Sequence, residues 1–421
     1  MKRFVLILVF LVLSAQSLFA APSLTLNEAL EMANSNHPQV IEAKENLHGA
    51  DARTGQALSS YYPQINFAAD WNKGRTYITA QDIIKTTEVN SAALYVKQTI
   101  YDFGRTSGVV EAAHGNREAA KQSLVITRQE LTLRVKSAFY LLLAAEKQVS
   151  AVAETVNARS AVLHQAEEFF NQGIRAKVDV AKAEANFYTA KTSLIRAENN
   201  RDIARLELAN AIGIATLGER TAVEPSAVSP NLPERAIIQQ QAVNNRAELQ
   251  QLAALKSAAS ANLKTAKGSY LPVLSGTANM GYADGNFPPT GNVWGAGLNL
   301  TMPLFSGFSS VEQVREAISA INIIEARQNN LRLQIGKEVE SAWLAANEAS
   351  ARIASTDKEV VAATESMALA EGRYHEGVGN IIEVTDAQTQ ALDARTAHIQ
   401  ATYDYYTALA RLDRAVGRNK E

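Results

Sequence analysis

The sequence predicts an α+β membrane protein in which one structural unit, a helix, a β-hairpin and two further helices, occurs twice. Three observations support this fold class. Segments in the two halves of the chain correspond at a nearly constant offset, short runs alternate between apolar and polar residues, and two long segments carry apolar residues at alternating steps of four and three.

The N-terminus has the layout of a secretory signal peptide. Lys2 and Arg3 precede an apolar run over residues 4–13, and small residues follow around Ala20. The run is too short to cross a bilayer as a helix. We therefore expect residues 1–20 to direct export and to be removed from the mature chain.

The composition narrows the possible functions. The formal net charge is −2, acidic and basic residues are well mixed, and there is no cysteine. A nucleic-acid-binding protein needs a basic face, so we expect no nucleic-acid partner. The lack of cysteine excludes disulfide bonds. Frequent alanine with interspersed charges is typical of long packed helices.

The duplication is visible from corresponding residues in the two halves. Ser60–Pro63 corresponds to Ser269–Pro272 at an offset of 209 residues. From Tyr101, which corresponds to Phe305, the offset is 204 and then holds without a gap. Shared helix propensity would not keep one register over roughly a hundred residues, so we predict two copies of one unit.

The domain boundaries follow from these copies. After the signal peptide we predict repeat 1 at residues 21–215, a linker at 216–233, repeat 2 at 234–417 and a C-terminal tail at 418–421. The linker is polar and contains three prolines, so we expect no regular element in it.

Each repeat is expected to begin with a helix. Thr25 and Glu28 form the sequence pattern of a capping box, in which each side chain satisfies an exposed backbone donor. Proline disfavours helical geometry in the residue before it, which predicts a bend near Asn36–Pro38. The corresponding helix of repeat 2 is expected to run from about residue 234 to 269.

A β-hairpin is expected at residues 61–103 of repeat 1 and at 270–305 of repeat 2. The strands alternate apolar with polar or small residues over about 9–11 positions, the length that a tilted strand needs to cross a membrane. A barrel with lipid outside and water inside has this pattern, and so has a soluble half-buried sheet. Aromatic residues near the strand ends suit membrane interfaces: Tyr61, Trp71, Tyr101, Tyr282, Trp294 and Phe305.

A long helix is expected after each hairpin. Apolar residues recur at alternating steps of four and three from Leu124 to Phe170 and from Ile335 to Tyr374, which is a heptad seam. A helix over residues 108–171 would be roughly 95 Å long at 1.5 Å per residue. A short turn containing glycine then marks each tip, and a second helix returns.

Four membrane strands in one chain cannot close a barrel, because an open sheet edge is not tolerated in lipid. The smallest closed barrels have about eight strands. The chain must therefore assemble with copies of itself, and two, three or four chains would each close the sheet.

Several segments resemble the outer membrane efflux protein (TolC) family, and the resemblance covers the mature chain. They are the opening at Leu24–Leu30 followed by Asn36–Pro38, the Tyr-x-Pro strand starts, the strand end at Phe305–Gly307, and most specifically Tyr374–Val378 continuing to Ile382–Ala387. The resemblance implies a homotrimer with a twelve-stranded β-barrel, four strands per chain, continued by a twelve-helix coiled-coil periplasmic tunnel.

The same resemblance implies a function and partners. The protein would be the passive exit duct of a tripartite efflux or type I secretion system in the outer membrane, in contact with its lipid. A periplasmic adaptor and an inner-membrane pump of the RND or ABC type would open it by docking at the tips. The adaptor contacts would be Gly173 and Ile174 in repeat 1, and Gly377 and Val378 in repeat 2.

The resemblance also places a ring of carboxylates at the tunnel entrance, at Glu383 and Asp386. A spacing of three residues puts both on one helix face, and three chains would supply a ring that favours cations and obstructs anions. On spacing alone, ordinary solvated helix positions are the favoured interpretation of both residues, and the resemblance reverses that preference.

A lock between the two helical hairpins is implied at Asp179 and Tyr374. The basic partner that the family has in the second hairpin is not matched, because Gly379 stands there, whereas Arg175 occupies the equivalent position of repeat 1. The lock is therefore expected to differ from the family pattern. Tyr374 also lies on the heptad seam, where simple packing is the alternative role.

No catalytic, cofactor or metal site is expected. The six histidines lack ligand spacing, and no nucleophile–base pair or phosphate loop occurs. The alternative to an export duct is a periplasmic coiled-coil adaptor or scaffold. Such an adaptor carries one helical hairpin between β domains, rather than two copies with amphipathic strands.

Overall fold

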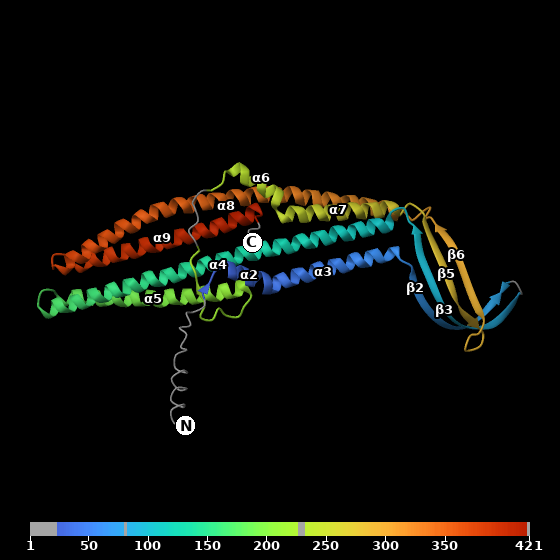
Figure 1. Ribbon diagram of the computed structural model, residues 1–421, viewed down its shortest axis with the longest axis horizontal. Helices are drawn as coiled ribbons and strands as arrows, with labels where there is room; N and C mark the ends of the chain where they lie inside the picture. The colour runs from blue at the N-terminus through green and yellow to red at the C-terminus, as the bar shows by residue number, and fades with distance from the viewer. Residues whose placement is uncertain (1–22, 80–81, 226–231, 419–421) are drawn as a thin grey trace, which may run out of the picture. The chain divides into compact units, whose positions relative to one another are not determined.

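The computed structural model describes residues 23–79, 82–225 and 232–418. The expected signal peptide at residues 1–20 lies outside the described residues. The described residues form two compact units (Figure 1). The first unit contains the described residues of 23–41, 127–225, 232–245 and 335–418, and the second those of 42–79, 82–126 and 246–334.

The second unit contains a four-stranded antiparallel sheet. Strands β2 (Gln64–Ile78) and β3 (Ile83–Tyr101) form one hairpin, and β5 (Val273–Asp284) and β6 (Asn292–Thr301) form the other. The order β2-β3-β5-β6 joins the hairpins through β3 and β5, which leaves β2 and β6 at the edges of one curved sheet (Figure 1).

The register of the sheet separates an apolar face from a more polar one. One row across the four strands consists of Phe67, Leu94, Met280 and Trp294. All four side chains are exposed in the single chain, Trp294 to 78%. The adjacent row, on the opposite face, holds residues that are more polar or smaller: Asn66, Tyr95, Asn279 and Gly295. The predicted alternation is confirmed, and it produces a broad uncovered apolar face.

Two strands are longer than the sequence pattern predicts. β2 has 15 residues and β3 has 19, and they stay paired as far as Ile78 and Ile83. β3 pairs with β5 only as far as Asn90, so the residues beyond it form a two-stranded ribbon. Trp71 pairs with Asn90. Its expected place near a strand end is therefore wrong, because the hairpin continues past the four-stranded part.

Helices precede and follow each hairpin of the sheet in the second unit. α3 (Pro38–Leu58) and α7 (Ala247–Gly268) precede the hairpins, and the first parts of α4 (Arg105–Asn171) and α8 (Ser309–His375) follow them.

α4 and α7 approach closely at two glycines of α4 that lie seven residues apart. A Cβ atom on Gly108 would lie 2.9 Å from the carbonyl oxygen of Ala261, and one on Gly115 would lie 2.8 Å from the backbone nitrogen of Ala258. Only a residue without a side chain fits at these positions, and the interval of seven keeps both on one helix face.

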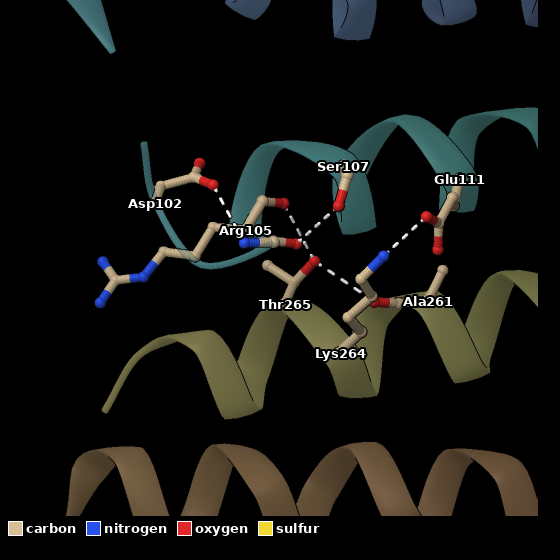
Figure 2. Close-up of polar contacts among 8 residues, drawn as sticks. Asp102, Arg105, Ser107, Glu111, Ala261, Lys264 and Thr265 are labelled. Carbon is tan, nitrogen blue, oxygen red and sulfur yellow. Dashed lines mark hydrogen bonds and ion pairs between the residues drawn. The ribbon is translucent and has the colours of Figure 1, made fainter. Parts of the chain in front are cut away.

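Longer side chains bridge the two helices around these glycines (Figure 2). Lys264 Nζ lies 2.7 Å from Glu111 Oε1. Arg105 Nε donates to the carbonyl oxygen of Gly268 at 2.8 Å, which satisfies a carbonyl at the end of α7. The helix pair that carries the sheet is thus held by close backbone approach and by polar contacts at its margin.

We expect Gly115→Ala to destabilise the protein by about 1–3 kcal/mol, because the added methyl group has no space beside the α7 backbone. Gly49→Ala in α3 is the matched control, since nothing lies within 4 Å of its added atom. There the helix propensity of alanine should stabilise by about 0.5–1 kcal/mol. The two thermal unfolding midpoints, measured in detergent, should move in opposite directions. Shifts of the same sign contradict the close packing of α4 on α7.

The first unit contains two helical hairpins. α5 (Lys177–Ile212) follows α4, and α9 (Ile381–Val416) follows α8. The predicted seams are buried in these hairpins: Leu131, Val135, Leu142, Val152 and Ala166 in α4, and Ile335, Val339, Ala346, Ala349 and Tyr374 in α8. Phe170, the last predicted seam position of α4, is exposed instead. Among the helices of the described ranges, none has both the length and the apolarity needed to cross a membrane.

The start of the first repeat folds as its capping signal predicts. In α2 (Leu26–Asn36), the Glu28 backbone N–H donates to Thr25 Oγ1 at 3.3 Å, and the Thr25 N–H donates to the Glu28 carboxylate at 2.8 Å. The helix ends at Asn36 and α3 begins at Pro38, which confirms the bend.

The helix expected at about residues 234–269 occupies this range, but it is interrupted. α6 (Arg235–Asn245) ends, and α7 starts after Arg246. Arg246 stands at the position of His37 by the offset of 209, so the second repeat breaks where the first does, without a proline. Arg246 is buried and forms an ion pair with Glu248 at 2.9 Å, and this local contact replaces proline as the feature at the break.

The expectation of no regular element in the linker is also wrong. Its residues Thr221–Ala222 form β4, which pairs in parallel with β1 (Ser23–Leu24). The first proline of the linker is Pro225, so the preceding backbone retains its donors. One of them, the Val223 N–H, donates to the Leu24 carbonyl oxygen at 3.0 Å.

Candidate functional site

The tips of the two helical hairpins have the same turn. The Gly173 N–H donates to the Phe170 carbonyl oxygen at 2.9 Å, and the Gly377 N–H donates to the Tyr374 carbonyl oxygen at 3.0 Å. Both glycines have positive φ, +73° and +76°, a conformation that glycine adopts without strain. The next residues, Ile174 and Val378, expose 55% and 73% of their surface. Each tip therefore presents an apolar side chain on a fixed turn.

The helices after the turns are capped differently. Asn380 Oδ1 accepts from the backbone N–H groups of Ile382 and Glu383, both at 2.9 Å, so α9 has a side-chain N-cap. The equivalent residue before α5 is Ala176, which has no side-chain acceptor. Asp179, in the first turn of α5, supplies a negative charge close to the helix N-terminus.

An apolar core joins the two hairpins just behind the tips, and we call it the tip core. Its fully buried residues come from all four helices: Ala166, Ala183, Ala370, Tyr374, Ile381, Val384 and Ala387. Tyr374 is the largest of these and is 1% exposed. Its ring centroid lies 5.8 Å from that of Phe169 on α4. The hairpins of one chain are therefore packed against each other at their ends.

The predicted lock residues are brought together, but not through the side-chain bonds that the sequence suggests. The Tyr374 hydroxyl is buried without a hydrogen-bond partner among the described residues. Burial raises the pKa of Tyr374, with a smaller contribution from the nearby Asp179 charge, while Arg175 opposes the increase. Within the described ranges, the charge of Asp179 acts on Tyr374, but the Tyr374 hydroxyl forms no hydrogen bond with it.

Arg175 makes the direct connection between the tips. Its Nη2 donates to the carbonyl oxygen of Gly377 at 2.9 Å and also to that of Gly379. Charged donors form strong hydrogen bonds with carbonyl oxygens, and these carbonyls belong to the turn of the other hairpin. The missing basic side chain at Gly379 is thus matched by a cation from repeat 1 that reaches the backbone at that position.

The two predicted entrance carboxylates lie in the first turns of α9 and differ in their surroundings. Glu383 is half-buried, and its Oε1 lies 3.3 Å from Arg373 Nε at the end of α8. Asp386 is exposed. The Arg373 charge partly neutralises Glu383, so Asp386 is the less compensated of the two.

Sequence reasoning missed the role of Arg159, one of the two polar residues on the α4 seam. It is 8% exposed, and its guanidinium donates to the Asn186 carbonyl oxygen on α5 and to Thr389 Oγ1 on α9. A charged residue within an apolar heptad seam is the signal that identifies it. Arg373 was missed because its partner Glu383 lies beyond the turn.

A sheet with an exposed apolar face, together with paired helical hairpins, defines the class of outer-membrane channels. The family comparison agrees, since the model described as "Outer membrane efflux protein" matches residues 29–214 and 238–418. The chain belongs to this family and is an outer-membrane efflux protein. The alternative of a periplasmic adaptor or scaffold receives no support from this match.

Similarity to known members extends over the chain. Outer membrane protein TolC of Escherichia coli K12 is 24% identical over 444 residues, covering 100% of this chain and 87% of that protein. TolC of Salmonella enteritidis is 26% identical over 445 residues with the same coverage. The crystal structure of VceC from Vibrio cholerae matches with a TM-score of 0.82 at 19% identity, covering 94% of this chain and 97% of that one. That structural likeness supports the fold.

We expect Tyr374→Phe to leave the thermal unfolding midpoint unchanged or slightly higher, because it removes a buried hydroxyl that has no partner. Tyr374→Ala should cost about 3–5 kcal/mol, because it leaves a cavity in the tip core. A Phe variant that is as unstable as the Ala variant would show that the hydroxyl is bonded in the assembled protein.

Proposed function

We propose that this protein is one subunit of a homotrimeric exit duct of a tripartite efflux or type I secretion system. The observation that carries the proposal is the four-stranded sheet, with its uncovered apolar face and its edge strands β2 and β6. β2 and β6 run in opposite directions in the sheet, so β6 of one subunit can pair antiparallel with β2 of the next. Three subunits then close a twelve-stranded barrel without an open edge.

The helical hairpins support the remainder of the duct. Four helices per chain give a twelve-helix coiled-coil tunnel that extends into the periplasm. We infer that residues 21–215 and 234–417 are duplicated repeats, because their elements follow in the same order. Each chain therefore supplies two similar segments of the ring of helices and strands that surrounds the channel axis.

The tips are the proposed contacts for a periplasmic adaptor, through Gly173, Ile174, Gly377 and Val378. Exposed apolar side chains on rigid turns provide small anchors with little entropy to lose on binding. An inner-membrane pump supplies the energy, and the duct itself is passive. Relatives include the "Alkaline protease secretion protein AprF" of Pseudomonas aeruginosa and the "Cobalt-zinc-cadmium resistance protein CzcC" of Cupriavidus metallidurans. One duct architecture therefore suits different cargo, selected by the pump.

The trimer is tested by cross-linking through cysteines introduced into a chain that has none. Chains with one cysteine in β2 and one in β6, scanned along both strands because barrel closure staggers their register between subunits, should include a pair that gives covalent dimers and trimers with a short bifunctional maleimide, and no larger species. Leu94→Cys with Met280→Cys, in the paired central strands β3 and β5, is the control and should link only within one chain. A soluble monomer, or a ladder that ends at two or four chains, contradicts the proposal.

The entrance ring is tested by ion selectivity in planar bilayers. Asp386→Ala should lower the cation-to-anion permeability ratio by about two- to fivefold, corresponding to roughly 0.5–1 kcal/mol of electrostatic energy. Glu383→Ala should have a smaller effect, because Arg373 already offsets that charge. The control is Glu359→Ala, an exposed acid elsewhere on α8. Equal changes for all three variants would show that net charge, rather than a ring, sets selectivity.

A further inference from the structure

A polar layer crosses the helices behind the tip core, and we call it the Arg159 layer. It consists of Arg159 on α4, Asn186 on α5, and Thr385 and Thr389 on α9. Arg159 Nη1 donates to the Asn186 carbonyl oxygen at 3.1 Å, and Nη2 donates to Thr389 Oγ1 at 3.0 Å. Asn186 Nδ2 donates to Thr385 Oγ1 at 3.1 Å. The layer thus ties the α4–α5 hairpin to α9.

The guanidinium of Arg159 is buried among neutral groups of the described residues. No carboxylate of the described residues forms an ion pair with it, and its Nε is buried without a partner. Burial lowers the pKa of Arg159, the direction that loss of hydration produces for a cation. Two neutral acceptors only partly offset the loss of hydration of a buried cation.

The layer lies at the end of a series of polar contacts between α4 and α9. Farther from the tips, Glu154 lies 2.8 Å from Arg395, and Gln148 donates to Thr396 Oγ1 at 3.0 Å. On the tip side of Arg159, the contact between hairpins consists of the apolar tip core and of Arg175. Arg159 therefore lies between the polar contacts of Glu154 and Gln148 and the apolar tip core.

The residues of the Arg159 layer are not repeated at the corresponding positions of the other repeat. At the offset of 204, Ala363 stands where repeat 1 has Arg159, and Gln390 stands where it has Asn186. The two threonines of α9 correspond to Ala181 and Ala185. The buried cation therefore affects the packing of α4 and α5 against α9. Repeat 2 has no corresponding cation.

We propose that Arg159 is a positioning residue of the gate, whose buried charge weakens the packing of the α4–α5 hairpin on α9 and so eases opening. This inference rests on the proposed function and adds that the entrance of the duct opens by separation of the tips. In the packed arrangement the guanidinium keeps an unsatisfied Nε, whereas water hydrates it fully once the helices part. Arg175 acts in the opposite direction, because its half-exposed charge gains two carbonyl acceptors when the tips meet.

The test measures how often the tip core opens. Ala166→Cys introduces a single thiol at a fully buried position of the tip core in a chain without cysteine. Maleimide reacts with it only when the hairpins separate, so the labelling rate of the purified full-length protein reports the open population. Ala401→Cys, buried in α9 away from the tips, reports general loosening of the fold.

Arg159→Met should slow the labelling of Cys at position 166 by about fivefold or more, because an apolar side chain of similar length packs without a buried charge. Arg175→Ala should speed the same reaction. Arg159→Lys retains a buried cation and should label close to the rate of the parent. Labelling at position 401 should stay unchanged in all three variants.

Faster labelling at position 166 in Arg159→Met would overturn the inference, since Arg159 would then be part of the lock. A rise at both reporter positions would overturn it too, because the inference requires an apolar replacement to keep or raise stability. Arg159→Lys behaving like Arg159→Met would show that charge is not the cause. Labelling needs no ion conduction, so a protein that forms no channel but shows opposite effects at the two arginines refutes the duct and keeps this inference.

Discussion

The backbone hydrogen bonds of a sheet in lipid are the constraint on which the rest of this structure depends. Each chain contains two hairpins joined through β3 and β5, and this leaves β2 and β6 as edge strands, which another chain satisfies in the proposed trimer. Water cannot form hydrogen bonds with the backbone groups of these strands inside a bilayer, so the edge strands must pair with protein when the sheet enters the membrane. The proposed duplication gives each subunit two hairpins that are already paired, so a barrel with a given number of strands needs half as many contacts between chains. The closed barrel of the proposed trimer is the arrangement that leaves none.

The helices meet a different requirement, because they must pack side by side over a great length with little volume to fill. Small residues solve this, as Gly108 and Gly115 show where α4 touches α7, and Ala166 and Ala183 where the hairpins meet. Alanine buries little apolar area per residue, so each contact contributes little. Stability then depends on the number of repeated contacts, with ion pairs such as Glu154–Arg395 placed along the helix margins.

Local signals made part of this structure predictable. The capping box at Thr25, the strand alternation and the heptad seam each depend on residues close in sequence, and each appears as predicted. Features decided by distant partners did not follow from the sequence. The ribbon beyond Asn90, the β1–β4 pairing and the contact of Arg175 with the turn at Gly377 all need knowledge of which segments meet. The exposed position of Phe170 has a local cause instead, because the seam ends where the turn begins.

In the proposed gate, Arg159 and Arg175 of repeat 1 act in opposite directions. An entrance held only by the tip core would be stabilised by every buried alanine and by Tyr374, and a partner would have to supply all of that energy to open it. A buried cation behind the core reduces this cost, while a half-exposed cation at the tip keeps the closed geometry defined through hydrogen bonds that a docking protein can replace. Placing both in one repeat makes the α4–α5 hairpin and its contact with α9 the element whose equilibrium a partner can shift. The partner then needs to compete only for the carbonyl groups that Arg175 reaches at Gly377 and Gly379, because Arg159 already opposes the packing behind them.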